Sequence, residues 1–274
     1  MPELPEVETI IRRLRTGTQD SPSVIDQTIN AVQVTWDRII ASPDPGQFKE
    51  ILVGKTIIDA RRRGKFMHFP LDDGHLFTHL RMSGDMRMEE ISQPKEPYDR
   101  VIINFKSGYR MVFSNIRKFG RMWYTDDPDE VIGDLGPEPL SDGFTPDLLH
   151  EKLRSHSRQI KPLLLDQTFI AGMGNVYTDE ALFQARIHPL RSSDSLTKAE
   201  AVNLHHAIQN VLQDGIRSLG ASIDWIYQGG QFQNYFKVYK RQDTPCPRCG
   251  TIIQKIRVGQ RGTHFCPSCQ KMDA

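Results

Sequence analysis

Residues 244–270 read TPCPRCGTIIQKIRVGQRGTHFCPSCQ, and this stretch decides how the end of the chain folds. Its cysteines form two Cys-x2-Cys pairs separated by sixteen residues: Cys246 and Cys249, then Cys266 and Cys269. Each pair places two thiolates on one tight turn, and four thiolates suit a tetrahedral Zn²⁺ ion. Disulfide and redox chemistry are competing interpretations, but two such pairs at zinc-ribbon spacing favour zinc. The set leaves no open coordination position, so the predicted zinc is structural.

The segment between the cysteine pairs, IQKIRVGQRGTH at 253–264, predicts a β-hairpin with a glycine-rich tip. Its polar residues at and near the tip are Arg257, Gln260, Arg261 and His264. A rigid hairpin that presents arginine beside flexible backbone suits a phosphate groove.

Charge is distributed unevenly along the chain. Residues 231–274 carry eight Lys and Arg against two Asp, whereas residues 1–230 carry 27 basic and 32 acidic side chains. A basic tail on a mildly acidic body suggests an anionic partner such as nucleic acid. A solvated basic surface explains the charge alone equally well.

The composition excludes several classes of protein. A chain of 274 residues, with 38% hydrophobic and 25% charged residues, is neither disordered, collagenous nor a coiled coil. No apolar run approaches the roughly 18 residues of a membrane span, and the acidic, proline-rich start is neither a secretory signal nor a transit peptide. All four cysteines lie in the last 29 residues, which excludes a disulfide framework. We expect a soluble, intracellular protein.

Periodicity predicts an α+β protein of several domains. After a helix with apolar residues at helical spacing from Val7 to Leu14, short alternating segments predict a β-sandwich or barrel up to about residue 125. A polar linker at 126–143 precedes two helical stretches, 145–166 and 196–219, and the second opens with a Thr-x-x-Glu capping box. Residues 232–241 return to a strand pattern. We expect a β domain over 1–130, a helical domain over 131–230 and a zinc module over 231–274.

The N-terminus, Met1-Pro2-Glu3, carries a second candidate for chemistry. Removal of Met1 would give Pro2 a free α-amine, whose pKa of about 7.7–8.0 leaves roughly a tenth unprotonated near pH 7. Such an amine can attack an electrophilic carbon and form an iminium, and Glu3 beside it can shuttle a proton. On these residues alone, a tolerated proline followed by acids that complement a helix dipole is the simpler interpretation.

Six motifs together favour a catalytic interpretation of Pro2 and Glu3 over the structural one. They are PELPEVE at 2–8, RRRGKF at 61–66, THLRMSG at 78–84, NIRKFG at 115–120, GMGNVYTDEAL at 172–182 and RGTHFCPSCQ at 261–270. In this order they resemble formamidopyrimidine-DNA glycosylase, the bacterial base-excision repair enzyme for oxidised purines, over essentially the whole chain. The resemblance implies an N-terminal β-sandwich with a leading helix, a helix–two-turn–helix domain and a zinc-finger hairpin.

The resemblance also implies catalytic roles. Pro2 would attack C1′ of the damaged nucleotide, and Glu3 would protonate the opening sugar. Lys65 would contact phosphate and assist β-elimination, although a basic strand end is the simpler interpretation from its neighbours alone. Arg261 would clamp the phosphates flanking the lesion and assist δ-elimination.

Further residues would bind DNA. An enzyme that acts on a base takes it out of the stack and fills the vacated space, and the residues that match the family's fillers are Met82, Arg117 and Phe119. Asn175, at a helix N-terminus, and His79 would contact the backbone. From pattern alone, Met82 and Phe119 would pass as core residues, His79 as structural and the Asn175 turn as a tight connection.

The sequence departs from the family pattern at several DNA-contact positions. Asn115 stands where the family usually has Asp, and Tyr98-Asp99-Arg100 replaces an HDH segment whose first His contacts DNA. A linker Lys is lost, and His156 lies near its place. Tyr98 can still donate a hydrogen bond, so these changes concern substrate detail rather than the reaction class.

The segment 222–232 looks several residues shorter than the loop that folds over an everted 8-oxoguanine in the family. Its aromatic residues, Trp225 and Tyr227, could stack on many bases or could pack against the helices. We therefore expect formamidopyrimidines to be processed at least as well as 8-oxoguanine.

The favoured prediction is a bifunctional DNA glycosylase and AP lyase. It would act as a monomer on damaged double-stranded DNA in the bacterial cytoplasm and nucleoid, with one structural Zn²⁺ and neither an organic cofactor nor a membrane. An endonuclease VIII-like glycosylase for oxidised pyrimidines is the alternative, although Leu4 favours the purine branch. A non-catalytic zinc-ribbon DNA-binding protein is the other alternative.

Overall fold

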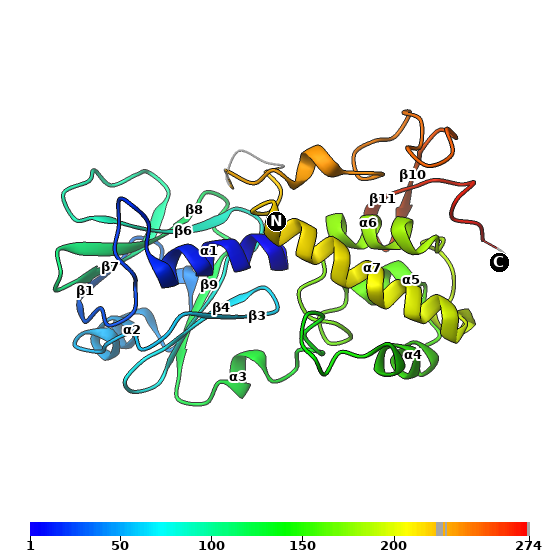
Figure 1. Ribbon diagram of the computed structural model, residues 1–274. Coiled ribbons are helices and arrows are strands. Elements are labelled where there is room, and N and C mark those ends of the chain that lie inside the picture. The colour runs from blue at the N-terminus through cyan, green and yellow to red at the C-terminus, as the bar shows by residue number, and fades with distance from the viewer. Residues whose placement is uncertain (223–226, 228, 273–274) are drawn as a thin grey trace. The chain divides into compact units, whose positions relative to one another are not determined.

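The computed structural model of the protein describes residues 1–222, 227 and 229–272, which form two compact units (Figure 1). The first unit comprises Met1–Asp134 and Ser222–Gly229, and the second comprises Leu135–Ala221 and Gly230–Ala274. The three domain ranges expected from the sequence stay a prediction.

The first unit is a β-sandwich with a leading helix, α1 (Leu4–Thr16). One sheet has the strand order β1 (Ile29–Val34), β7 (Asp99–Phe105), β8 (Tyr109–Asn115), β6 (Gly84–Glu90). The other has the order β2 (Ile40–Ser42), β9 (Arg121–Thr125), β5 (His75–His79), β4 (Phe66–Pro70), β3 (Arg61–Arg63). Only β2 and β9 pair in parallel among these strands. The short helices are η1 (Asp37–Ile39), α2 (Pro45–Leu52) and α3 (Asp129–Ile132).

Helix α1 is held by its apolar face, as its periodicity predicts. Val7, Ile10, Ile11 and Leu14 are all buried in one core with side chains from both sheets. At the start of the helix the Glu6 carboxylate accepts a hydrogen bond from the Glu3 backbone N–H at 2.8 Å. The core and this cap together fix the N-terminus against the sandwich.

The second unit combines helices with a two-stranded sheet. Its helices are α4 (Pro146–Arg154), α5 (Ile160–Leu165), α6 (Asn175–Ala185), α7 (Lys198–Arg217), η2 (Ser193–Ser195) and η3 (Phe232–Tyr235), and its strands are β10 (Gln254–Val258) and β11 (Arg261–Phe265). The predicted capping box of α7 is confirmed, since Thr197 and Glu200 each accept the other's backbone N–H. Strands β10 and β11 form the predicted hairpin.

The expectation of one helix over 145–166 was wrong, because the chain breaks it into α4 and α5. Pro162 lacks the N–H that a helix interior needs, and its ring would clash with the carbonyl of residue 158. In the structure it lies in the first turn of α5, where no such donor is required. The intervening backbone instead pairs with 191–193, through Ile160 N–H to Arg191 O and Ser193 N–H to Arg158 O, both 2.8 Å.

The expectation of a strand over 232–241 was also wrong. This segment begins with η3 and continues as an irregular chain. The Glu180 carboxylate of α6 accepts the backbone N–H groups of Lys237, Val238 and Tyr239 at 2.9–3.1 Å. These donors are therefore satisfied by a side chain rather than by a neighbouring strand.

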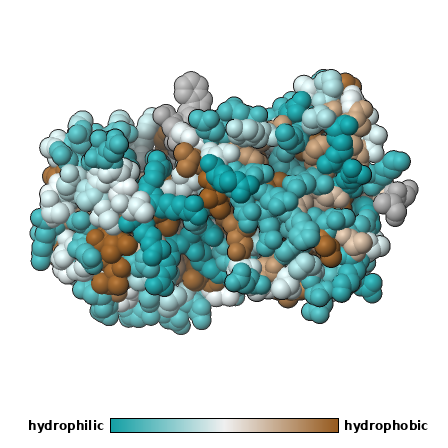
Figure 2. Space-filling model, in the orientation of Figure 1, coloured by the Kyte–Doolittle hydropathy of each residue, from teal (hydrophilic) through white to brown (hydrophobic). Residues whose placement is uncertain are grey.

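On the face drawn in Figure 2, the surface is mainly hydrophilic with small separate hydrophobic areas. In the part of the chain that the structure describes, every helix is too short or too polar for a membrane span.

Candidate functional site

The N-terminal pair predicted to carry the chemistry lies at the start of α1. Pro2 is buried, Glu3 is 4% exposed, and the preceding Met1 is 44% exposed. Since the Glu3 N–H is bonded to Glu6, the backbone that carries the Glu3 carboxylate is fixed. In this chain the Pro2 nitrogen is an amide of Met1, so its use as an amine requires the removal of Met1.

Lys65 and His79 belong to the same sheet of the first unit. Lys65 lies in the turn between β3 and β4, and His79 pairs with the neighbouring Phe66 across β4 and β5. Burial, the Arg81 charge and the Lys65 charge lower the pKa of His79 to about 3. Its Nδ1 accepts the Arg81 backbone N–H at 3.0 Å, so the ring proton is on Nε2. His79 is therefore a neutral hydrogen-bond donor at physiological pH.

Two turns carry the residues expected to fill the vacated space in DNA. Met82, between β5 and β6, is 37% exposed, and Phe119, between β8 and β9, is 48% exposed. Arg117 is exposed on the second turn, with its guanidinium 5.2 Å from the Phe119 ring centroid. These side chains are thus presented to solvent rather than buried in the core.

Asn115 and Ser83 join these two turns. The Asn115 Oδ1 accepts the backbone N–H groups of Phe119 at 2.9 Å and Gly120 at 3.4 Å, and its Nδ2 donates to Leu80 O at 3.2 Å. Ser83 Oγ accepts the Arg117 N–H at 2.9 Å. Because an aspartate could not donate to Leu80 O, the departure from the family pattern at Asn115 adds a link between the turns.

Tyr98 and Arg100 adjoin the same loop. Tyr98 is 44% exposed, and its carbonyl accepts the Asn115 N–H at 2.8 Å. Arg100 donates to Asn115 O at 3.1 Å and lies 5.7 Å from the Tyr98 ring centroid. Asp99 between them is buried and paired with Arg87 at 3.0 Å, so it holds the strand rather than facing solvent.

In the second unit, Asn175 and Arg261 lie close in space. Asn175 opens α6, and its Nδ2 donates to the carbonyl of Gly262, the residue after Arg261, at 3.0 Å. A hollow of about 440 Å³ is lined by Asn175, Tyr239, Lys240, Gln242, Lys255, Gly262 and His264. Two lysines beside a helix N-terminus make this hollow suited to an anion such as phosphate.

The Arg261 side chain is exposed at the hairpin tip. Gly259 and Gln260 have φ values of 52° and 63°, the two positive angles of a type I′ turn. Arg257 is also exposed, whereas His264 is buried. The hairpin therefore presents its arginines outward, as predicted.

His156 lies at the C-terminal end of α4, where its Nδ1 is 2.8 Å from Lys152 O. Its ring packs edge-on against Phe169, with centroids 5.4 Å apart. These local contacts leave its DNA-binding role a prediction.

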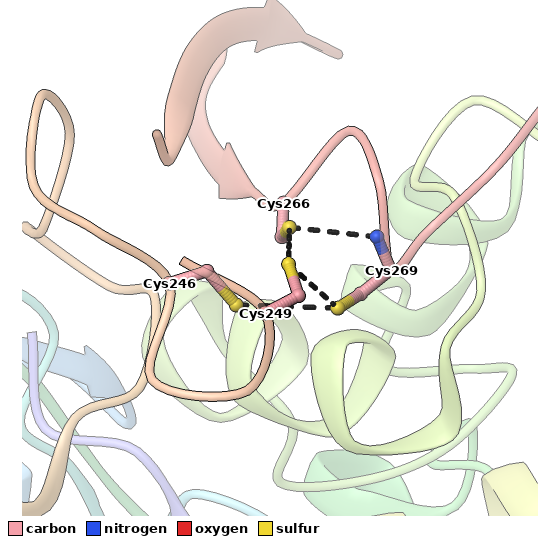
Figure 3. Close-up of side chains that lie close together, drawn as sticks. All are labelled: Cys246, Cys249, Cys266 and Cys269. Atoms are coloured by element: carbon pink, nitrogen blue, oxygen red, sulfur yellow. Dashed lines mark hydrogen bonds between the residues drawn. The ribbon is translucent and has the colours of Figure 1, made fainter. Parts of the chain in front are cut away.

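The four cysteines converge at one point (Figure 3). Their sulfurs lie within 4.8 Å of one another, with neighbouring pairs at 3.4–4.0 Å. A disulfide would need about 2.05 Å, whereas Zn–S bonds of about 2.3 Å in a tetrahedron separate the sulfurs by about 3.8 Å. Backbone N–H groups of Arg248 and Cys269 point at the sulfurs of Cys246 and Cys266, both at 3.4 Å. The residues fit one structural zinc.

The segment 222–232 is only partly described. Trp225 lies outside the described residues, whereas Tyr227 is 7% exposed and belongs to the core of the first unit. Burial, the largest influence, raises the pKa of Tyr227 to about 12, and its hydroxyl is hydrogen-bonded to Thr9. Tyr227 therefore packs against α1, which was one of the two alternatives for it.

Sequence reasoning missed several residues that hold these elements. The linking role of Asn115, the anchoring role of Glu180 and the place of Tyr239 in the hollow all depend on contacts between distant parts of the chain. The aromatic and basic content of residues 235–242 is a signal that could have indicated Tyr239.

Comparisons with known proteins agree with this arrangement. Residues 1–122 match the formamidopyrimidine-DNA glycosylase N-terminal domain, residues 135–225 match the H2TH domain of the same enzyme, and residues 244–271 match the zinc finger found in FPG and IleRS. The formamidopyrimidine-DNA glycosylases of Pelotomaculum thermopropionicum and Cytobacillus firmus are each 43% identical to the chain. These alignments cover 99% and 98% of this chain and the whole of each relative.

Solved structures with DNA are similar as well. The Lactococcus lactis Fpg in complex with Fapy-dG-containing DNA and a MutM in complex with carbocyclic 8-oxo-G-containing DNA each have a TM-score of 0.90 and 38% identity. Each match covers 98% of this chain and 100% of the solved one. The zinc-finger match and the cysteine geometry together assign one structural zinc to the hairpin. Because these proteins match 98–99% of its length, the chain belongs to the formamidopyrimidine-DNA glycosylase family.

Proposed function

We propose that this chain excises oxidised purines from duplex DNA through Pro2 and then cleaves the strand as an AP lyase. Membership of the family carries the glycosylase activity, and the DNA in the similar complexes contains Fapy-dG or an 8-oxoguanine analogue. The observation that carries the proposal is Pro2 followed by the buried Glu3 at a capped helix start. The endonuclease VIII-like and non-catalytic alternatives are not favoured, because the reported relatives are all purine-lesion glycosylases by name.

The first stage is displacement of the base. After removal of Met1, the Pro2 nitrogen forms a bond to C1′ of the damaged nucleotide, and the C1′–base bond breaks with the electron pair and a proton going to the base. Glu3 protonates the sugar oxygen as the ring opens, which leaves an iminium at C1′.

The second stage is strand cleavage. The iminium accepts electrons when the C2′ proton is removed, so the 3′ phosphate leaves by β-elimination. A further elimination releases the 5′ phosphate, and water then hydrolyses the sugar from Pro2. Lys65 and Arg261 assist these steps by holding the phosphates that leave, as cations suit that task.

DNA positioning is divided between the units. In the first unit, Met82, Arg117 and Phe119 fill the space left by the everted nucleotide, where apolar wedges support unstacking and arginine donates to the opposite base. The neutral His79 donates its Nε2–H to phosphate. In the second unit, phosphates of the same duplex bind to Arg261, to Asn175 and to the hollow that Asn175 lines.

The proposal also includes Tyr98 and His156 as DNA contacts, and a monomer that acts on the bacterial nucleoid without an organic cofactor. Exposure of Tyr98 beside the Asn115 loop supports the first of these.

Borohydride trapping on abasic and lesion-bearing duplexes tests the nucleophile. We expect a covalent adduct from the processed chain and none from a variant that retains Met1, because an amide nitrogen cannot form an iminium. Mass spectrometry establishes the state of the N-terminus, and a binding assay establishes that the unprocessed form still binds DNA. Equal adduct yield with Met1 retained would exclude Pro2.

A further inference from the structure

Among the residues that the structure describes, no strand covers one edge of β11. This strand pairs with β10 in a two-stranded sheet, and the backbone groups of Gly262 and His264 face away from β10. An uncovered edge of this kind leaves N–H and C=O groups without ladder partners. In this unit side chains from α5 and α6 supply the missing partners.

Three side chains carry these contacts. Lys161 of α5 donates to Gly262 O at 3.1 Å, beside the Asn175 amide at 3.0 Å. One oxygen of Asp179 on α6 accepts the Lys161 ammonium at 2.5 Å, and the other accepts the His264 backbone N–H at 2.9 Å and lies 3.2 Å from His264 Nδ1. The side chains of Lys161 and Asp179 are fully buried.

The carboxylate is therefore shared between an ammonium group and the hairpin. Each of its two oxygens has a separate partner, so its negative charge both compensates Lys161 and orders the backbone of β11. The Asp179 carboxylate fixes His264 directly and Gly262 through Lys161. Gly262 is one position from Arg261, and His264 is three positions from it. The hairpin tip is fixed on the same side, since a Cβ on Gly259 would lie 3.1 Å from Pro162 of α5.

We propose that Asp179 is a positioning residue for Arg261: it sets the hairpin so that the arginine meets the DNA phosphates. This inference rests on the proposed function of Arg261. Asp179 itself touches no DNA and acts through the backbone of residues 262–264.

A double-mutant cycle tests the coupling. The probe is a duplex with a tetrahydrofuran abasic analogue, and the variants are Asp179→Asn, Arg261→Ala and both together. Asparagine keeps an acceptor for the His264 N–H but removes the negative charge of Asp179 from beside the Lys161 ammonium. We expect Asp179→Asn to weaken binding about tenfold in the wild-type background and to have no further effect in the Arg261→Ala background.

The salt dependence of binding separates positioning from general destabilisation. Arg261→Ala should make the slope of log K against log salt shallower by about one, and Asp179→Asn should do the same because the phosphate contact is lost. Asp214→Asn is the matched control, since Asp214 is an exposed carboxylate paired with Arg217 on α7, and it should change neither affinity nor slope. Zinc content is measured for every variant.

Hydrogen exchange measured without DNA tests the positioning role of Asp179 separately from the phosphate-binding role of Arg261. Asp179→Asn should speed exchange of the amides in residues 261–265 and leave those of α7 unchanged. If Arg261→Ala has no effect on binding, the proposed function of Arg261 fails, while exchange still decides whether Asp179 holds the hairpin. If Asp179→Asn does not fold, the neutral pair Lys161→Met with Asp179→Asn replaces it. Equal loss of affinity in both backgrounds, or unchanged exchange at 261–265, would overturn the inference.

Discussion

Replacing Asn115 should uncouple the two turns that carry Met82 and Phe119. Its side chain makes three hydrogen bonds, to the N–H groups of Phe119 and Gly120 and to Leu80 O, and it is completely buried. Alanine would remove all three, and at about 1 kcal/mol for each bond the free energy of unfolding should fall by about 3 kcal/mol. Aspartate would keep both acceptors and lose only the donor to Leu80 O, so Asn115→Asp should cost about 1–2 kcal/mol.

Urea unfolding followed by tryptophan fluorescence measures these differences. Trp36 and Trp123 both belong to the first unit, so their signal follows the unit that contains Asn115. Asn104→Ala, at a half-buried asparagine of β7, is the matched control and should change stability by less than about 0.5 kcal/mol. In a lesion duplex, 2-aminopurine placed opposite the lesion should report weaker insertion in Asn115→Ala. Stability of Asn115→Ala within about 0.5 kcal/mol of wild type, or equal to that of Asn115→Asp, would contradict the linking role of the Asn115 side chain.

Four further predictions follow from the sites. Glu3→Gln should lose base excision while retaining more activity on abasic DNA, where the glycosidic bond is already broken; equal loss in single-turnover assays on both substrates would contradict its role. Metal analysis should find about one zinc per chain, and chelation should unfold the hairpin and weaken DNA binding, because structural zinc supplies folding free energy; active protein without zinc would refute this. Because the pKa of His79 is about 3 in the folded chain against 6.5 unfolded, the unfolded state binds more protons between these values, so stability should fall as pH is lowered through that window. His79→Gln should flatten this decrease in unfolding experiments at pH 7.5 and pH 5, and an unchanged decrease would assign it to other groups. Finally, kcat/KM for formamidopyrimidine opposite cytosine should at least equal that for 8-oxoguanine, and a preference above about tenfold for 8-oxoguanine, some 1.4 kcal/mol, would contradict the interpretation of the 222–232 segment.

The sequence pattern predicted those elements that are specified by residues close together in the chain. The apolar period of α1, the capping box at Thr197 and the cysteine spacing each specify structure through residues a few positions apart, and all three are found. Strand β6 carries charged side chains, among them Arg87 and Glu89, at alternating positions. In β6 these charges are satisfied by tertiary pairing, as Arg87 with Asp99 and Arg110 with Glu89 show.

Acidic residues in α6 show why contacts between distant parts of the chain could not be predicted from the sequence. Asp179 and Glu180 stand side by side in a helix, a pattern typical of a solvated surface, yet they are 1% and 3% exposed. Their burial is tolerated because they accept backbone N–H groups from His264 and from residues 237–239, which are more than fifty positions away. The catalytic roles of Pro2 and Glu3 follow from the family resemblance, because a proline followed by a glutamate is too short a motif to predict catalysis by itself.

The Glu180 anchor has a consequence for how the zinc module assembles. The carboxylate holds residues 237–239 on α6 without any metal, and Cys246 follows only seven positions after Tyr239. The first cysteine pair is thus tethered near its final place by contacts that involve no metal ion, so less loop-closure entropy should be lost when zinc binds. Metal capture then resembles an intramolecular reaction with a high effective concentration of thiolates. A chain stripped of zinc should therefore recover its finger faster than an isolated peptide of residues 244–271.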